Sequence, residues 1–278
     1  MAHGFPLDQC SAIITGASSG LGAEFARQLA PQARALLLVA RNVEQLKQRQ
    51  AELLALRPGL AVQLCAADVT TESGRAAVLD AARQMQPNLL INNAGMGDYG
   101  GFAEADVVKV RAQVELNITA LLLLTHAILP MLKTPGGILN VSSLASTVPM
   151  PDVAVYAATK AFVTSFSEAL RVELADRGIV VSAMCPGPTP TNFSKTAKRS
   201  DGTDTDRSGQ GVLRVPPEFV VQQGLLGLTR NKACVFPGAG VSIAASIFRL
   251  MPRALMRWII ARRHHAAHAR QSPSTGNI

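Results

Sequence analysis

Three residues that could move a proton lie near the middle of the chain. Tyr156 and Lys160 are four residues apart in the segment Tyr-Ala-Ala-Thr-Lys, and Ser143 precedes the tyrosine by 13 residues. Positions i and i+4 share one face of a helix, so the phenol and the ammonium would point into the same cleft. A tyrosine with a pKa of about 10 is a poor acid at neutral pH, and a neighbouring cation brings that pKa toward the working range. The spacing indicates acid–base chemistry, although an exposed Tyr/Lys pair on an amphipathic helix would look the same.

A glycine-rich turn near the N-terminus could hold a dinucleotide. The apolar run 11–14 is followed by Thr15-Gly16-Ala17-Ser18-Ser19-Gly20-Leu21-Gly22 and then by a helical segment, 23–29. Glycines let the backbone approach a pyrophosphate, which the N–H groups and the dipole of the following helix attract. The spacing Gly-x-x-x-Gly-x-Gly differs from the commoner Gly-x-Gly-x-x-Gly. By itself, the motif also fits a turn that binds nothing.

Strand-like and helical segments alternate along most of the chain. The apolar runs are 35–40, 61–65, 89–91, 137–141, 179–184 and 233–236, and the helical segments are 43–57, 72–85, 104–133, 153–177 and 216–228. Runs that are apolar throughout are typical of strands buried on both faces of a parallel sheet. We therefore predict an α/β fold with a doubly wound parallel sheet of the Rossmann type. It forms one domain over residues 8–240, followed by a C-terminal extension, 241–278.

With this order of elements, the chain resembles the short-chain dehydrogenase/reductase family over roughly residues 8–240. The resemblance rests on separate blocks in the family's order. They are the turn Thr15–Gly22, Asp68-Val69, Asn92-Asn93-Ala94-Gly95, Asn117, Ser142-Ser143, Tyr156-x-x-x-Lys160 and Pro186-Gly187-x-x-x-Thr191. Parallel α/β sheets bind ligands at the carboxyl ends of their strands. Most of these blocks directly follow a predicted strand, so we expect them along one edge of the sheet.

The resemblance implies a catalytic role for four residues. Tyr156 would exchange a proton with the substrate oxygen, and Lys160 would lower the tyrosine pKa and bind the nicotinamide ribose. Ser143, the later serine of the pair, would hold the substrate oxygen. Asn117 would support the proton path to Lys160, although an asparagine in a helix could also be a satisfied polar group of the core. The implied cofactor-binding residues are Gly16, Ser18, Ser19, Gly20, Leu21, Gly22, Arg41, Asn42, Asp68, Val69, Asn93, Ala94, Gly95, Tyr156, Lys160, Pro186, Gly187, Thr189 and Thr191.

The end of the second strand indicates which cofactor is preferred. Members that bind NAD need a carboxylate there for the ribose 2′-hydroxyl, whereas an arginine suits a 2′-phosphate. Arg41 occupies this place, and the first acidic residue after it is Glu44. We predict NADP(H) and the reduction of a ketone or aldehyde, with an apolar or lipid-like substrate. The alternatives are an NAD-dependent alcohol or hydroxysteroid dehydrogenase working oxidatively, and a regulatory member that binds the cofactor without catalysis.

Composition bounds the setting and the partners. The chain has a net charge of +8 and four scattered cysteines, which suggest reduced thiols of a cytoplasmic protein. The N-terminus lacks the pattern of a signal peptide, and the longest apolar stretch, 118–132, is too short to span a bilayer. The histidines have no metal-ligand spacing, and no nucleic-acid motif accompanies the basic residues. Beyond a small-molecule carbonyl or alcohol substrate, the resemblance implies a homodimer or homotetramer formed through the helices at 104–133 and 153–177.

Two further segments would shape the substrate site. Residues 190–214 are polar and would form either a mobile lid or a disordered insertion. Residues 249–270 carry six arginines and no acidic residue, with apolar residues and Trp258 between them. Such a helix could lie on an anionic membrane as a peripheral contact. We favour the alternative, in which it packs over the mouth of the active site or in a subunit interface.

Overall fold

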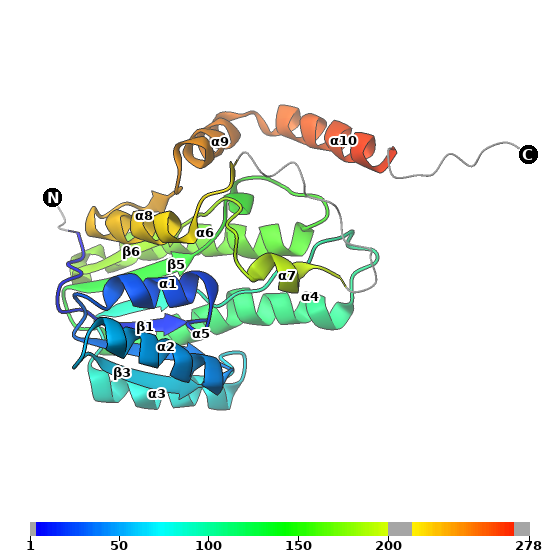
Figure 1. Cartoon of the computed structure of the whole chain (residues 1–278). Helices are drawn as coiled ribbons and strands as arrows, with labels where there is room; N and C mark the ends of the chain where they lie inside the picture. Colours follow the sequence, from blue (N-terminus) through cyan, green and yellow to red (C-terminus); the bar gives the residue numbers. More distant parts are fainter. Residues whose placement is uncertain (1–3, 200–212, 270–278) are drawn as a thin grey trace, which may run out of the picture.

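A parallel sheet of seven strands forms the centre of the molecule (Figure 1). The computed structural model describes residues 4–199 and 213–269. In the sheet the strands run in the order β3-β2-β1-β4-β5-β6-β7, and every neighbouring pair is parallel. The strands are β1 (Ser11–Thr15), β2 (Ala35–Ala40), β3 (Ala61–Ala66), β4 (Leu89–Asn92), β5 (Gly136–Val141), β6 (Ile179–Met184) and β7 (Cys234–Val235). The order reverses between β1 and β4, which confirms the predicted doubly wound sheet.

Helices cover both faces of this sheet. One layer contains α1 (Gly20–Leu29), α2 (Val43–Leu56) and α8 (Pro217–Thr229), and the other contains α3 (Glu72–Met85), α5 (Leu121–Ile128) and α6 (Ala154–Leu174). Successive strand residues point to opposite layers, so Leu36 and Leu38 pack with the first layer and Leu37 and Val39 with the second. The continuous apolar runs of the sequence follow from this burial on two sides.

The long helix predicted at 104–133 contains a π-helical segment. It consists of α4 (Val107–Val114), the π-turn η1 (Glu115–Ala120), α5 and the short 3-10 turn η2 (Leu129–Met131). Over Val107–Met131 this helix is long and apolar enough to cross a membrane. The sequence-based prediction had excluded a span here, because it counted only the shorter apolar stretch 118–132. Its inner side chains, Leu124 and Ile128 among them, pack against the sheet as part of the core. The π-turn contains Asn117, and such turns are frequent at functional sites.

A chain of buried polar side chains fixes α6 against the sheet. Asn92 Nδ2 donates to Asn140 Oδ1 at 2.9 Å, and Asn140 Nδ2 donates to Ser167 Oγ at 2.9 Å. These groups join β4, β5 and α6, and all three residues are buried. Buried polar groups that satisfy one another fix a unique arrangement, because any other packing would leave donors unpaired. The helix that carries Tyr156 and Lys160 is thereby held in one register on the sheet.

The chain beyond β6 contributes three more helices. The short helix α7 (Phe193–Ala197) lies in the segment 190–214, which was predicted as a lid or an insertion. Residues 200–212 of this segment lie outside the described residues. The extension forms α9 (Ala239–Leu250) and α10 (Arg253–Ala269), which lie above the rest of the chain in Figure 1. The sequence placed the boundary between the domain and the extension at residue 240, whereas α9 begins at Ala239. This boundary stays a prediction. The seven-stranded sheet with its helices is a single domain.

Candidate active site

The glycine turn after β1 has the backbone that close contact with a ligand requires. Gly16 and Gly20 have φ angles of +66° and +55°, a region that other residues rarely adopt. A Cβ on Gly22 would lie 2.1 Å from the Gly16 carbonyl oxygen, so only glycine allows α1 to begin this close to the turn. Ser19 stands at the N-cap of α1 without a side-chain capping hydrogen bond. The turn therefore offers free backbone at a helix N-terminus, which fits the pyrophosphate of a dinucleotide.

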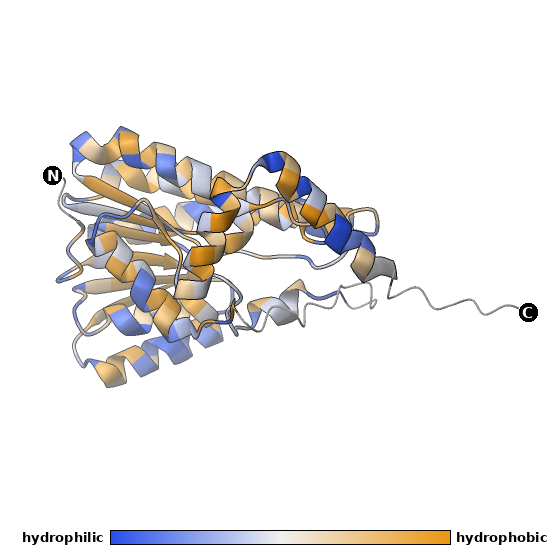
Figure 2. Cartoon of the chain, turned by 90° about the horizontal axis from the view of Figure 1, so that it is seen from above, coloured by the Kyte–Doolittle hydropathy of each residue, from blue (hydrophilic) through white to orange (hydrophobic). Residues whose placement is uncertain are grey.

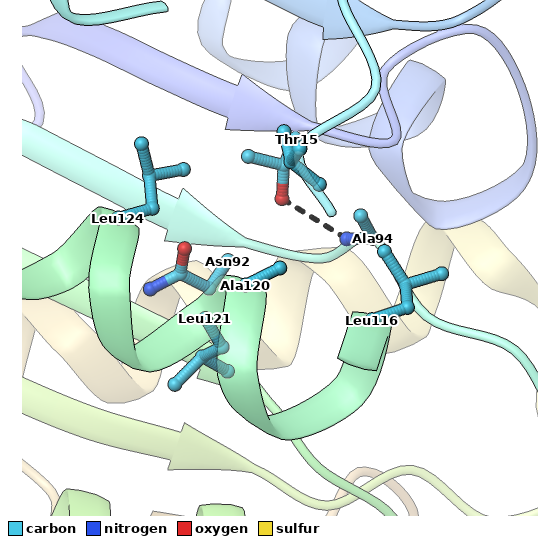
Figure 3. Close-up of a pocket in the computed structure, with 8 residues that line it drawn as sticks. Thr15, Asn92, Ala94, Leu116, Ala120, Leu121 and Leu124 are labelled. Carbon is cyan, nitrogen blue, oxygen red and sulfur yellow. Dashed lines mark hydrogen bonds between the residues drawn. The ribbon is translucent and has the colours of Figure 1, made fainter. Parts of the chain in front are cut away.

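Thr15 and Asn93 hold this turn against β4. Thr15 Oγ1 accepts hydrogen bonds from the N–H groups of Asn93 and Ala94, at 2.9 and 3.0 Å. Asn93 Nδ2 donates to the Thr15 carbonyl oxygen at 2.9 Å. Figure 3 shows Thr15, Ala94, Leu116 and Leu124 among the residues that line a small cavity. Ala94, which the sequence assigns to the cofactor, therefore lines this cavity.

Arg41 and Asp68 lie near one another beyond the ends of β2 and β3. Arg41 is exposed. Burial raises the pKa of the Asp68 carboxyl, but hydrogen bonds from Thr70 and the charge of Arg41 together hold it below its usual value. Asn42 Oδ1 accepts from the Gln45 N–H at 3.0 Å, so this side chain caps α2. An exposed guanidinium thus stands where the sequence places the ribose of the adenosine half.

Asn117 and Lys160 meet at Gly95. A Cβ on Gly95 would lie 3.2 Å from Asn117 Oδ1 and 3.3 Å from Lys160 Nζ, so the missing side chain leaves room for both. Lys160 is buried and donates to the Val141 carbonyl oxygen at 2.8 Å. Burial lowers the pKa of Lys160 to about 8, against a smaller opposing effect of Cys185. Asn117 Nδ2 donates to Thr159 Oγ1 at 3.0 Å, so this asparagine is tied to the helix that carries the lysine.

Tyr156 lies on the same face of α6 as Lys160, as the spacing predicts. The Lys160 Nζ is 5.8 Å from the centre of the tyrosine ring. Ser143 caps the turn after β5, where its Oγ accepts from the Ala145 N–H at 3.1 Å, and it is partly exposed. Ser142 is buried, and its Oγ donates to the Lys160 carbonyl oxygen at 2.8 Å. The two serines therefore have separate tasks, and the partly exposed Ser143 is the one that a substrate could reach.

The segment after β6 closes over the glycine turn. The Pro186 carbonyl oxygen accepts from the Leu144 N–H at 2.8 Å, which joins this segment to the serine turn. Thr189 Oγ1 donates to the Gly187 carbonyl oxygen at 3.1 Å. A Cβ on Gly20 would lie 3.5 Å from the Thr191 Cβ. Thr191, near the end of the segment, thus lies directly beside the turn expected to hold the pyrophosphate.

Comparison with known proteins agrees with this geometry. The family model described as short chain dehydrogenase matches residues 11–202. This chain belongs to the short-chain dehydrogenase family. It is an oxidoreductase acting on carbonyl or alcohol substrates, and the family members of known structure bind a nicotinamide cofactor.

Several members of the family are similar over most of the chain. Sepiapterin reductase of Rattus norvegicus is 37% identical over 224 residues, which cover 75% of this chain and 85% of that protein. A short-chain dehydrogenase from Sphingobium yanoikuyae, solved in complex with NADPH, has a TM-score of 0.72 and 29% identity, covering 97% of this chain and 98% of that one. The bulky-bulky ketone specific alcohol dehydrogenase from Comamonas testosteroni has a TM-score of 0.69 and 26% identity, covering 97% of each chain.

In this dehydrogenase, α7 and the two residues after it lie against the site. We call Phe193–Arg199 the α7 segment. The Phe193 ring centre is 5.5 Å from that of Tyr156, and a Cβ on Gly97 would lie 2.9 Å from the Phe193 ring. The Tyr99 N–H donates to the Ala197 carbonyl oxygen at 3.0 Å. The α7 segment therefore covers Tyr156 with an aromatic ring. The sequence predicted a lid or an insertion over 190–214 but singled out no residue of Phe193–Arg199.

A buried ion cluster fastens the end of the α7 segment. Arg199 Nη2 lies 2.5 Å from Asp98 Oδ2, and Lys109 Nζ lies 2.8 Å from Asp98 Oδ1. The side chains of Asp98 and Arg199 are 5% and 7% exposed. Burial raises the pKa of the Asp98 carboxyl, but hydrogen bonds and charge from Arg199 and Lys109 together hold it below its usual range. These residues are far apart in the sequence, so no motif signalled the cluster.

The depressed pKa of Asp98 predicts how acid loosens this cluster. A carboxyl whose pKa is lower in the folded state adds stability that is present above its unfolded pKa, about 3.9, and is lost as pH falls through the folded value. We expect Asp98→Asn to lower the free energy of unfolding by about 1–3 kcal/mol at pH 7. The difference from the wild type should shrink below about pH 4. Urea unfolding at a series of pH values measures it.

Asp80→Asn is the matched control, because Asp80 pairs with Arg83 on the exposed surface of α3. This substitution should change the free energy of unfolding by less than about 1 kcal/mol at every pH. A difference between wild type and Asp98→Asn that is the same at pH 7 and at pH 3.5 would contradict the assignment.

Proposed function

We propose that this protein is an NADPH-dependent carbonyl reductase that converts an apolar ketone or aldehyde to the alcohol. The observation that carries the proposal is the meeting of Asn117 and Lys160 at Gly95, with Tyr156 one helical turn before the lysine. A proton donor, a buried cation and a polar relay thus converge beside the glycine turn. This is the arrangement that reduction of a carbonyl by hydride transfer needs from the protein.

The chain's own residues would handle the proton. The nicotinamide supplies the hydride when it is bound. The Tyr156 hydroxyl gives its proton to the substrate oxygen, and the Lys160 ammonium stabilises the phenolate that remains. Ser143 Oγ donates a hydrogen bond to the same substrate oxygen and orients it. Asn117 lies in the π-turn close to Lys160 and would line the side along which a proton returns to the tyrosine.

Arg41 supports a preference for NADP(H). Its guanidinium is exposed beyond the end of β2, close enough to Asp68 to hold down the pKa of that carboxyl. A guanidinium can bind the 2′-phosphate with two hydrogen bonds, whereas NAD requires an acceptor for its 2′-hydroxyl. The similar structure from Sphingobium yanoikuyae was solved with NADPH. Because NADPH is a reductant, this preference favours the reductive direction.

The surroundings of Tyr156 support a bulky apolar substrate. Phe193 lies against the tyrosine from the α7 segment, which is fastened by Asp98 and Arg199. An aromatic ring over the reacting group suits an apolar carbonyl compound, because polar substrates would lose hydrogen bonds there. The similar enzyme from Comamonas testosteroni is described as specific for bulky-bulky ketones.

We also propose a two-fold oligomer formed through α4 and α6. Val108 at the start of α4 is 71% exposed and Val172 near the end of α6 is 76% exposed. Large apolar side chains exposed on neighbouring helices are typical of an isologous interface. The dimer or tetramer expected from the resemblance would bury them.

The first prediction tests the proton donor. Tyr156→Phe should lower turnover with NADPH and a ketone by about 10² or more, the scale of general acid catalysis. NADPH affinity and thermal stability should stay close to the wild type, since only a hydroxyl is removed. Tyr99→Phe, which alters the other tyrosine of the chain, is the control and should keep most of its turnover. Equal turnover for Tyr156→Phe and the wild type would remove the proposed mechanism.

The second prediction tests the cofactor. Arg41→Asp should weaken NADPH binding at least about tenfold more than NADH binding, because an anion would then face the 2′-phosphate. Lys47→Asp makes the same change of charge at an exposed position on α2 and should leave the ratio of affinities unchanged. Fluorescence titration of the two cofactors measures both constants. An equal loss for both cofactors would place Arg41 away from the phosphate.

The third prediction tests the oligomer. Light scattering at micromolar concentration should give a mass at least twice that of the 29.3 kDa chain. Val108→Asp combined with Val172→Asp should reduce it to one chain, since the same face of both chains would then bury unpaired carboxylates in the interface. Leu56→Asp, at an exposed position on α2, should leave the mass unchanged. A single-chain mass for the wild type would exclude the dimer.

A further inference from the structure

The C-terminal extension is attached at the active-site end of the sheet. Val241 and Ala245 on the inner side of α9 are 1% exposed, and a Cβ on Gly187 would lie 2.7 Å from Val241 Cγ2. On α10, His264 Nδ1 lies 3.7 Å from Asp152 Oδ2, four residues before Tyr156. The extension therefore rests on the cofactor segment at one end and reaches the mouth of the catalytic site at the other. This contact is the packing that sequence analysis favoured, but it occupies only one side of the two helices.

The outer side of the extension exposes a stripe of large apolar side chains. On α9, Ile243, Ile247 and Leu250 are 60%, 51% and 85% exposed. Their spacing of four and three residues places them on one face, opposite Val241 and Ala245. On α10, the apolar side chains of Leu255 and Trp258 are also exposed, at 46% and 55%. Figure 2 shows mostly apolar positions along α9 and a mixture of apolar and strongly polar positions along α10. Exposed apolar surface of this extent indicates a binding face.

Five arginines lie along the two helices of the extension, and neither helix carries a carboxylate. Residues 239–269 contain five arginines and no aspartate or glutamate. Arg249 pairs with Glu168 of α6 at 3.0 Å, and the Arg262 guanidinium lies 4.9 Å from the centre of the Trp258 ring. For Arg253, Arg257 and Arg263 the described residues provide no ion pair within 4.0 Å. The two helices thus combine exposed apolar side chains with positive charge that, among the described residues, a carboxylate pairs only at Arg249.

We propose that α9 and α10 form a docking face for the surface of a bilayer that contains anionic lipids. Ile243, Ile247, Leu250, Leu255 and Trp258 would enter the boundary between headgroups and acyl chains, and the arginines would contact lipid phosphates. Charge complementarity carries this choice, because an anionic surface would compensate the arginines that pair with no carboxylate of the described residues, which are all of the five except Arg249. Tryptophan with a stacked arginine suits this boundary, where one side is apolar and the other wet.

Two observations argue against other arrangements. The helices meet at an angle of 119°, so together they do not form the straight helix of about 20 residues that spans a bilayer. A second copy of the chain on the same face would bring arginines against arginines, which is unfavourable. A peripheral position on the membrane fits both the bend and the charge.

Docking in this way would place the active-site mouth at the membrane. Gly187 and Asp152, which the extension contacts, belong to the segments around the cofactor and Tyr156. The substrate would then be a carbonyl compound dissolved in the bilayer, a conclusion that rests on the proposed function. The docking itself rests only on the surface of α9 and α10.

Vesicle binding of the full chain tests the proposal. We expect at least about tenfold more protein to co-sediment with vesicles of phosphatidylcholine and phosphatidylglycerol than with phosphatidylcholine alone, and less as salt is raised. Replacing Arg253, Arg257 and Arg263 by Gln should weaken binding roughly 10- to 100-fold and reduce its salt dependence. Replacing Ile247, Leu250 and Trp258 by Ser should weaken binding by a similar factor at every salt concentration.

Matched controls separate this effect from charge in general and from catalysis. Replacing Arg83, Arg177 and Arg230 by Gln removes the same charge from other exposed sites and should leave binding within about twofold of the wild type. The Tyr156→Phe protein should bind vesicles as the wild type does, so a failure of the proposed reductase would leave the docking result intact. Absence of vesicle binding, or equal binding to both lipid compositions, would overturn the proposal. So would self-association that only the substitutions in α9 and α10 abolish, because a second copy would then occupy the face.

Discussion

Burying the ammonium group of Lys160 imposes a condition on the whole active-site end of the molecule. A charged group out of contact with water is costly, and its burial lowers the pKa of this lysine to about 8. No carboxylate among the described residues forms an ion pair with it; its described partner is the Val141 carbonyl oxygen at the end of β5. The position of the cation is therefore set by a strand end, and a phenolate or a ribose hydroxyl placed beside it would gain the interaction that the lysine lacks.

The cation is held in place only if the end of the sheet, the π-turn and α6 all lie within hydrogen-bonding distance of one another. The amide chain through Asn92 and Asn140 fixes α6 on β4 and β5, and Ser142 binds the backbone of Lys160 itself. From the other side, Asn117 reaches Thr159, one residue before the lysine. Each contact leaves a buried polar group unpaired if it is broken, so a small shift of one element would cost several hydrogen bonds together. The rigidity that acid–base chemistry needs follows from this mutual dependence.

The α7 segment and the C-terminal extension lie outside this buried hydrogen-bond network and are held by other contacts. The α7 segment is fastened by an ion cluster on Asp98. The extension is fastened by the packing of Val241 on Gly187, by an exposed pair on Glu168 and by a partly buried pair on Asp152. These contacts do not involve the buried amide chain, so the covering of the site can differ in shape and strength without disturbing the proton-transferring groups. Substrate choice and contact with a surface can thus be encoded separately from the chemistry.

The sequence by itself determined the fold, and it named the four residues that we propose as the catalytic set. Apolar runs such as 35–40 and 179–184 became strands with the predicted bounds, because residues buried on both faces of a parallel sheet must be apolar throughout. Tyr156 and Lys160 share a face because their spacing is helical, and Gly16 and Gly20 have the positive φ angles that the glycine turn required. Only the tertiary structure decided what covers the site. Asp98 and Arg199 are 101 residues apart, and whether α9 turns a given side chain inward or outward depends on the surface beneath it. Local spacing fixes which residues share a face, whereas contacts between distant segments depend on how the whole chain packs.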